Sequence, residues 1–198
     1  LYEAHARYVT VGLPFVIAKF AMSLDGKIAT VTGQSKWITG EQARHYGTSL
    51  RGIHDSVMVG VGTVIADDPL LTYRDGKETS PTLQPLRIVV DSKARTPISM
   101  RLLTQPGRTL LATAEPSKDR VAALEAAGAE VLRMPDGDGR VDIASLLRYL
   151  GKQEVTSVIV EGGSRLLGSF FDLRLVDKVL AFVAPVILGG QTALSPVA

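Results

Sequence analysis

The chain has 198 residues, which is enough to bury a hydrophobic core and lies within the usual size of a single domain. Its 22 basic and 20 acidic side chains leave a formal net charge of +2, which argues against a broad basic surface for nucleic acid or for a membrane. The sequence has no cysteine, which excludes a disulfide framework, a thiolate zinc site and a cysteine nucleophile.

The sequence carries no sign of membrane insertion or secretion. No stretch is apolar over the length that a bilayer requires, and the first residues lack the pattern of a signal peptide. We therefore expect a soluble protein, and the lack of cysteine fits a reducing cytoplasm. Because the chain begins at Leu1 and stops soon after Gly189-Gly190, we allow for a longer native polypeptide.

Apolar runs of strand length alternate along the chain with segments of helical period, which predicts an α/β domain. The first stretch, 2–8, reads as the end of a linker helix, so we expect a linker over 1–14 and the domain over 15–198. The predicted strands are 15–22, 56–61, 86–90, 108–113, 129–132, 155–160 and 179–183. The run 155–160 does not alternate between apolar and polar residues, which is typical of a parallel strand buried on both faces.

The first helix of the domain is predicted from a capping box. Thr39 is the expected N-cap and Gln42 follows three residues later, with the helix ending near Arg51. Arg44, Thr48 and Arg51 then share one face of this helix.

Later helices are bounded by equally plain signals. Ser117 is the expected N-cap of a helix that Gly128 ends, and Asp142 of one that Gly151 ends. A further helix begins after the sequence at 161–164. The polar segment 75–85, with two prolines, is expected to be a mobile surface loop.

Two glycine-rich segments follow predicted strands. Ligands collect at the carboxyl ends of parallel strands, where glycine lets backbone amides approach a phosphate. The first segment, 60–63, is only part of a dinucleotide fingerprint, because Ile65 occupies the third glycine position. The second, 161–165, joins a strand end, two glycines and a helix start, and is the better diphosphate candidate. A tight strand-to-helix turn explains its composition equally well.

Single polar residues suggest chemistry, each with a simpler alternative. Lys19 lies in an apolar strand, where a lysine is costly to bury unless it is paired or used. Asp67 can bond a polar ligand or merely cap a turn. Arg51 and Arg74 can clamp a phosphate, although most arginines are simply solvated. Trp37 can stack on a flat ring, although core packing is the more usual fate. The three histidines have no metal-ligand spacing, so no metal is expected.

Three segments in order and at the right spacing carry a family resemblance: KFAMSLDGK at 19–27, GQSKWITG at 33–40 and VGVGTVIADDPLLTYR at 59–74. Together with 90–92 and 160–163, they resemble the reductase domain of the bifunctional riboflavin-biosynthesis deaminase-reductase. The resemblance implies a dihydrofolate-reductase-like three-layer fold, with a mostly parallel central sheet flanked by helices. It also implies a homodimer that binds NADPH beside 5-amino-6-(5-phosphoribosylamino)uracil and transfers hydride to C1 of the opened ribose.

The resemblance also assigns site residues by position. It implies cofactor contacts at Ala21, Trp37, Thr63, Asp67, Ser92 and the loop 163–169, which includes Gly163, Ser164, Arg165, Leu166 and Leu167. It implies substrate contacts at Lys19, Ser35, Arg51, Leu71, Arg74 and Glu161, with Lys19 and Asp67 as the catalytic candidates. From position and charge alone, Lys93 or Arg95 can meet the 2′-phosphate of NADPH.

Two departures from this family and two rival functions remain. The zinc deaminase half is absent from the sequence, so a deaminase is expected either fused to this domain or working beside it. The family's last strands, after Gly189-Gly190, are also absent. The rivals are a reductase of a pterin or another pyrimidine, and a nucleotide-binding module without turnover. Ser35 and the paired arginines favour a phosphorylated substrate, while Lys19, Asp67 and Glu161 together favour turnover.

Overall fold

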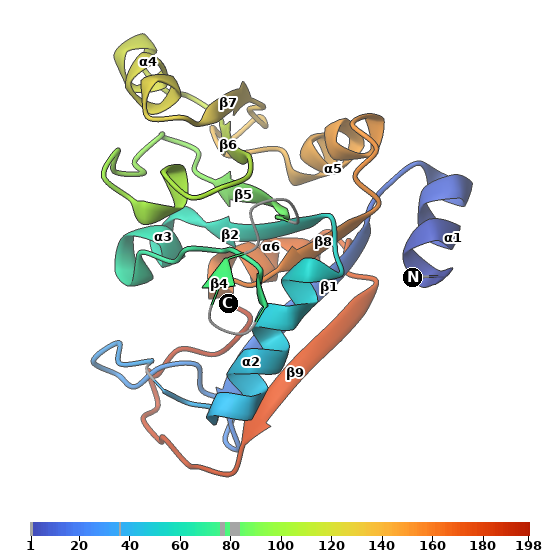
Figure 1. Cartoon of the computed structure of the whole chain (residues 1–198). Coiled ribbons are helices and arrows are strands. Elements are labelled where there is room, and N and C mark those ends of the chain that lie inside the picture. The colour runs from blue at the N-terminus through green and yellow to red at the C-terminus, as the bar shows by residue number, and fades with distance from the viewer. Residues whose placement is uncertain (1, 36, 76–77, 80–83) are drawn as a thin grey trace.

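The computed structural model describes residues 2–35, 37–75, 78–79 and 84–198, and within them a seven-stranded sheet forms the centre of the molecule (Figure 1). The strand order is β7-β6-β5-β2-β8-β1-β9, and every neighbouring pair is parallel. The strands are β1 (Phe15–Ser23), β2 (Ser56–Gly60), β5 (Leu86–Val90), β6 (Thr109–Thr113), β7 (Glu130–Arg133), β8 (Ser157–Val160) and β9 (Lys178–Ala184). A separate hairpin pairs β3 (Arg74–Asp75) with β4 (Glu78–Thr79).

Helices cover both faces of the sheet and so make three layers. They are α1 (Tyr2–Val11), α2 (Glu41–Ser49), α3 (Val61–Asp67), α4 (Lys118–Ala126), α5 (Ile143–Lys152) and α6 (Ser164–Asp172), with short 3-10 turns at Leu50–Gly52 and Arg101–Leu103. The predicted α/β fold with a parallel sheet is therefore confirmed. No helix in the described part of the chain is both long enough and apolar enough to cross a bilayer.

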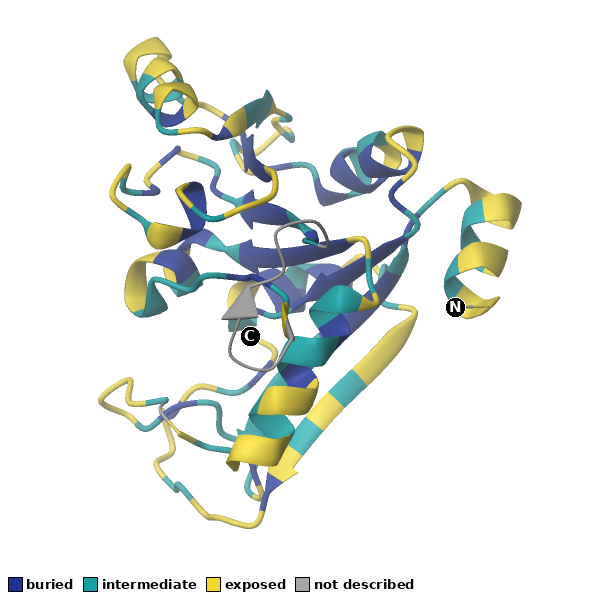
Figure 2. Cartoon of the chain, in the orientation of Figure 1, coloured by how far each residue is buried: buried dark blue, intermediate teal, exposed yellow. Residues whose placement is uncertain are grey.

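Alternate residues of the central strands enter two different cores. Met58 and Ile88 pack with the apolar faces of α5 and α6, whereas Val57 and Val89 face α3 and α4. Both faces of these strands are therefore dry, which explains why their sequences show no polar alternation. Figure 2 shows the contrast with β9, an edge strand on which Val179 and Val183 are exposed.

All the predicted strands form, with ends shifted by at most two residues. The caps predicted at Ser117 and Asp142 are also confirmed, because each side chain accepts a hydrogen bond from a backbone N–H of the first turn. The segment 2–8 is helical, as part of α1. The division of the chain at residue 14 stays a prediction, as does the absence of the family's last strands.

Two helix boundaries were predicted wrongly. Gly40, not Thr39, is the N-cap of α2, and no side chain caps that end. Gly151 does not end α5, which continues to Lys152. Gly151 is instead required by close packing, because a Cβ there would collide with the carbonyl oxygen of Gly12. A glycine inside a helix was thus mistaken for a stop signal.

Some elements had no signal that we recognised. The strand predicted over 56–61 ends at Gly60, and the chain continues directly as helix α3, which was not predicted. Within the segment predicted as a mobile loop, 75–85, the described residues include part of the β3-β4 hairpin. Residues 76–77 and 80–83 of that segment lie outside the described residues, so its mobility stays a prediction.

Candidate active site

The two glycine segments predicted from the sequence meet at the carboxyl ends of β2 and β8. The backbone N–H of Gly60 donates to the carbonyl oxygen of Gly162 over 2.7 Å. Thr63 Oγ1 lies 3.4 Å from the position that a Cβ on Gly163 would occupy. Because β2 and β8 are neighbours in the sheet, the turn after each strand packs against the other. The structure thus brings Thr63 beside Gly163, two residues predicted to contact one cofactor.

This pair of turns can hold a diphosphate. The N-cap Gly163 starts α6, whose first N–H groups lack acceptors within the helix and carry the positive end of its dipole. At Gly62 a Cβ would meet no other atom within 4 Å, so the α3 turn leaves room for a ligand. The side chains of Leu166 and Leu167 are buried in the core, so any contact by these residues would come from the main chain. The residues present therefore fit a dinucleotide.

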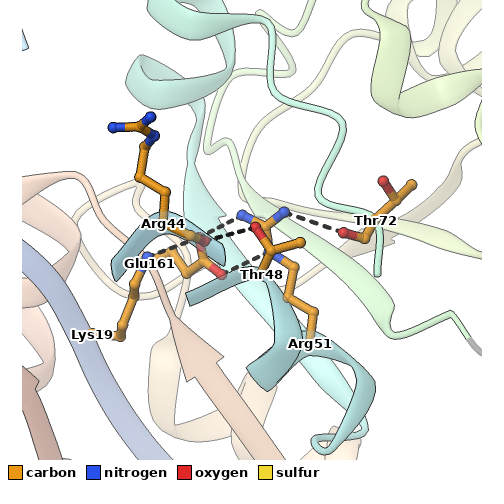
Figure 3. A network of polar contacts seen from close by, with 6 residues as sticks. All are labelled: Lys19, Arg44, Thr48, Arg51, Thr72 and Glu161. Carbon is orange, nitrogen blue, oxygen red and sulfur yellow. Dashed lines mark hydrogen bonds and ion pairs between the residues drawn. The ribbon is translucent and has the colours of Figure 1, made fainter. Parts of the chain in front are cut away.

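Beside these turns, a carboxylate bridges two basic side chains, as Figure 3 shows. Glu161, directly after β8, accepts hydrogen bonds of 2.8 Å from both Nε and Nη2 of Arg51. Lys19 Nζ of β1 lies 3.6 Å from Glu161 Oε2. The side chain of Glu161 is 8% exposed, against 14% for Arg51 and 19% for Lys19. The lysine predicted to need a partner therefore has one.

The electrostatics of the cluster keep Glu161 ionised. Burial by itself would raise the pKa of this carboxyl group, because a charge is poorly solvated inside the protein. The positive charges of Arg51 and Lys19, together with their hydrogen bonds, outweigh that effect and lower the pKa to about 2. Glu161 is therefore an anion throughout the neutral range.

Helix α2 and the segment after α3 complete the walls of the cluster. A Cβ on Gly47 would lie 3.3 Å from both Cε and Nζ of Lys19, so glycine at this helical position makes room for the lysine. Arg51 Nη1 donates to the carbonyl oxygen of Thr72 over 3.3 Å. Sequence reasoning missed Gly47 and Thr72. A glycine inside a predicted helix was the available signal for the first.

The other predicted residues lie around this centre. Ser92 follows β5, and its Oγ accepts from the N–H of Val141 over 3.3 Å. Asp67 is the last residue of α3 and is partly exposed. Leu71 is 2% exposed, so a substrate contact there would involve its main chain. Ala21, Ser35 and Ser164 are also partly exposed, whereas Trp37, Arg74, Lys93, Arg95 and Arg165 are exposed.

The structure joins Lys19, Arg51 and Glu161 directly. The phosphate contact predicted for Arg51 together with Arg74 stays a prediction. Arg51 is held inside the cluster by Glu161, while Arg74 stands on the exposed hairpin strand β3.

A parallel sheet with two glycine turns that fit a dinucleotide, next to a buried Lys-Glu-Arg cluster, defines an α/β domain of the dihydrofolate-reductase-like fold class. The chain belongs to the RibD C-terminal domain family, which it matches over residues 14–197.

Named relatives agree with this family. The riboflavin biosynthesis protein RibD of Actinobacillus pleuropneumoniae is 38% identical over 96% of the chain, which covers 50% of that relative. A 2,5-diamino-6-ribosylamino-4(3H)-pyrimidinone 5′-phosphate reductase of Methanothermobacter thermautotrophicus is 41% identical over 91% of the chain and 82% of its own length. The structure of Acinetobacter baumannii RibD has a TM-score of 0.85 at 32% identity and covers 100% of this chain, which spans 53% of it. The chain thus spans about half the length of the RibD relatives.

Proposed function

We propose that this domain uses NADPH to reduce 5-amino-6-(5-phosphoribosylamino)uracil to its ribitylamino form. The observation that carries the proposal is the buried cluster of Lys19, Arg51 and Glu161 beside two glycine turns that fit a dinucleotide. The names of the relatives support it, since they include reductases of a ribosylamino-pyrimidinone phosphate.

In this proposal the cofactor is held along the carboxyl edge of the sheet. The nicotinamide supplies the hydride, and the protein orients it and excludes water. The N–H groups at the start of α6 bind the diphosphate. Thr63, which follows β2, and Ser92, which follows β5, provide further contacts to the cofactor. The exposed side chains of Lys93 and Arg95, just after β5, favour NADPH over NADH because they offer positive charge to a 2′-phosphate.

The substrate lies over the charged cluster. Arg51 already uses Nε and Nη2 on Glu161, so its capacity for a phosphate is small. Arg74 is exposed and is therefore the stronger candidate for the phosphate. Ser35 and the main chain at Leu71 provide further polar contacts.

Lys19 faces the reacting part of the substrate in this arrangement. Reduction at C1 requires the ribose to open, after which hydride adds to C1 and the neighbouring nitrogen gains a proton. The ammonium group of Lys19, held 3.6 Å from Glu161, can stabilise the charge that develops in these steps or supply a proton. Asp67 is the second polar candidate near the cofactor.

The partners follow from the same proposal. A deaminase provides the substrate, either fused to this domain, as the double length of the RibD relatives suggests, or as a separate protein. We also propose a homodimer in the cytoplasm. Light scattering of the purified chain tests the first of these two statements and fractionation of cells the second.

NADPH oxidation by the purified chain, followed by absorbance, tests the function. The phosphoribosylamino-uracil is supplied freshly by a separate deaminase, and dihydrofolate is assayed in parallel. Turnover with the first substrate alone is the expected result. Turnover with dihydrofolate alone would instead establish a pterin reductase, and NADPH binding without oxidation would support a nucleotide-binding module.

A further inference from the structure

One arginine holds the end of the second resemblance motif, 33–40, which leads directly into helix α2. The guanidinium carbon of Arg44 lies 4.4 Å from the ring centroid of Trp37. Its Nη1 also donates to the carbonyl oxygen of Thr39 over 2.6 Å. Arg44 stands in the first turn of α2, where its own N–H donates to Gly40. A single side chain on a packed helix therefore fixes two points of the preceding segment.

The indole that Arg44 holds is not part of the core. Trp37 is 71% exposed, although a tryptophan gains much by burial. A planar guanidinium stacks well on an indole and attracts its π electrons. Trp37 thus has its position defined by Arg44 while most of its surface stays open to a ligand. A flat aromatic ring is the ligand group that such a surface suits best.

Helix α2 links this indole to the charged cluster. Three residues after Arg44, Gly47 packs against the end of Lys19, and the 3-10 turn after α2 carries Arg51. Arg44 to Gly47 spans about 4.5 Å along the helix axis. In Figure 3 the guanidinium of Arg44 extends away from Glu161, so Arg44 is not a member of the cluster. Arg44 makes its contacts at the N-terminal end of α2, whereas Gly47 and Arg51 lie at and after the C-terminal end.

We propose that Arg44 is a positioning residue, which holds Trp37 as a stacking surface for an aromatic ring of the bound dinucleotide. This role rests on the proposed function. Arg44 acts through Trp37 and touches neither the substrate nor the charged cluster. It makes the placement of the cofactor depend on α2, the same helix that makes room for Lys19.

The test uses the fact that Trp37 is the only tryptophan, so all tryptophan emission comes from it. The full chain is compared with Arg44→Ala, Arg44→Lys and the control Arg148→Ala, an arginine on α5 that bonds Ser145. Emission anisotropy of the ligand-free protein reports how firmly the indole is held. Energy transfer from Trp37 to NADPH reports binding, and steady-state kinetics separate KM from kcat.

Arg44→Ala should lower the anisotropy and raise the KM for NADPH about tenfold, with kcat changed by less than about twofold. Arg44→Lys should recover part of the loss, because an ammonium keeps its attraction to the indole, and Arg148→Ala should match the parent. Unchanged anisotropy and unchanged NADPH binding in Arg44→Ala would overturn the role of Arg44 alone. A parent chain that neither binds nor oxidises NADPH would overturn the proposed function as well, which the parent measurement reveals first.

Discussion

Glu161 and Arg51, which are 110 positions apart in the sequence, form a bidentate ion pair with two N–O distances of 2.8 Å. Both side chains of the pair are largely buried, and the Nζ of Lys19 adds a second positive charge 3.6 Å from Oε2 of Glu161. Because one carboxylate is the shared counter-ion of both cations, the stability of this site depends on Glu161 more than on either basic residue.

Glu161→Gln should destabilise the protein by about 3 kcal/mol, because it leaves Arg51 and Lys19 buried without a counter-charge. Urea unfolding measures the change. The matched control is Glu130→Gln, which removes the carboxylate of an exposed pair with Arg108 and should cost less than about 1 kcal/mol. Equal losses in the two variants would show that burial adds nothing to the importance of Glu161.

Acid should lower the free energy of unfolding of the parent protein by protonating the same carboxyl group, that of Glu161. The pKa of Glu161 falls from 4.5 to about 2 on folding, so its contribution is complete above pH 4.5 and is lost as the pH falls toward 2. The linked loss is on the order of 3 kcal/mol. Unfolding by urea at several pH values should show a smaller acid loss in Glu161→Gln than in the parent. Parallel curves for the two proteins would contradict the assignment.

The sequence predicted parts of this site but not their assembly. The cost of burying a charge in an apolar strand indicated that Lys19 has a partner. The identity of Glu161 as that partner depends on β1 and β8 lying side by side, and the pattern of each strand alone does not specify strand order. Likewise, the glycines at 60–63 and 161–165 predicted turns, whereas their contact follows from the pairing of β2 with β8.

Helix starts were predictable where a side chain caps them, and the start of α2, where glycine occupies the N-cap, was not. Ser117 and Asp142 bond the first turn of their helices, and these boundaries were correct. At α2 the extended backbone of Gly40 takes the N-cap position without a side-chain bond, so the capping box at Thr39 gave a wrong start. The end predicted for α5 at Gly151 was wrong for another reason. A glycine can be required by close packing inside a helix as well as by helix termination, and Gly151 packs against the main chain of Gly12.

Gly47→Ala should separate activity from stability. The added methyl group would lie 3.3 Å from the end of Lys19, which is flexible and can move, while alanine is favoured over glycine in a helix by about 0.5–1 kcal/mol. The melting temperature should therefore stay the same or rise, while kcat falls about tenfold because Lys19 is displaced. Gly137→Ala, where a methyl group meets nothing within 4 Å, is the control. Full activity in Gly47→Ala would argue against a reacting role for Lys19.

Arg74→Ala should weaken binding of the pyrimidine substrate and leave NADPH binding nearly intact. The exposed guanidinium is expected to bind the substrate phosphate, and a hydrogen bond to a charged group contributes about 1.5–3 kcal/mol. The KM for the substrate should therefore rise at least about tenfold. Isothermal titration with NADPH provides the second measurement. Equal loss of both ligands would contradict a phosphate role.

The double variant Lys93→Ala, Arg95→Ala should reduce the preference for NADPH over NADH. Both side chains are exposed on the turn after β5, and this turn is fixed from beneath by buried Asp91, which accepts hydrogen bonds from the N–H and Oγ1 of Thr96. Removal of the two charges therefore changes the surface and leaves the turn in place. We expect NADPH to lose at least about tenfold in kcat/KM while NADH changes little, because only NADPH carries the 2′-phosphate. Competition by 2′,5′-ADP, compared with 5′-AMP, measures the same contact without turnover, and an equal loss for both nucleotides would place the 2′-phosphate elsewhere.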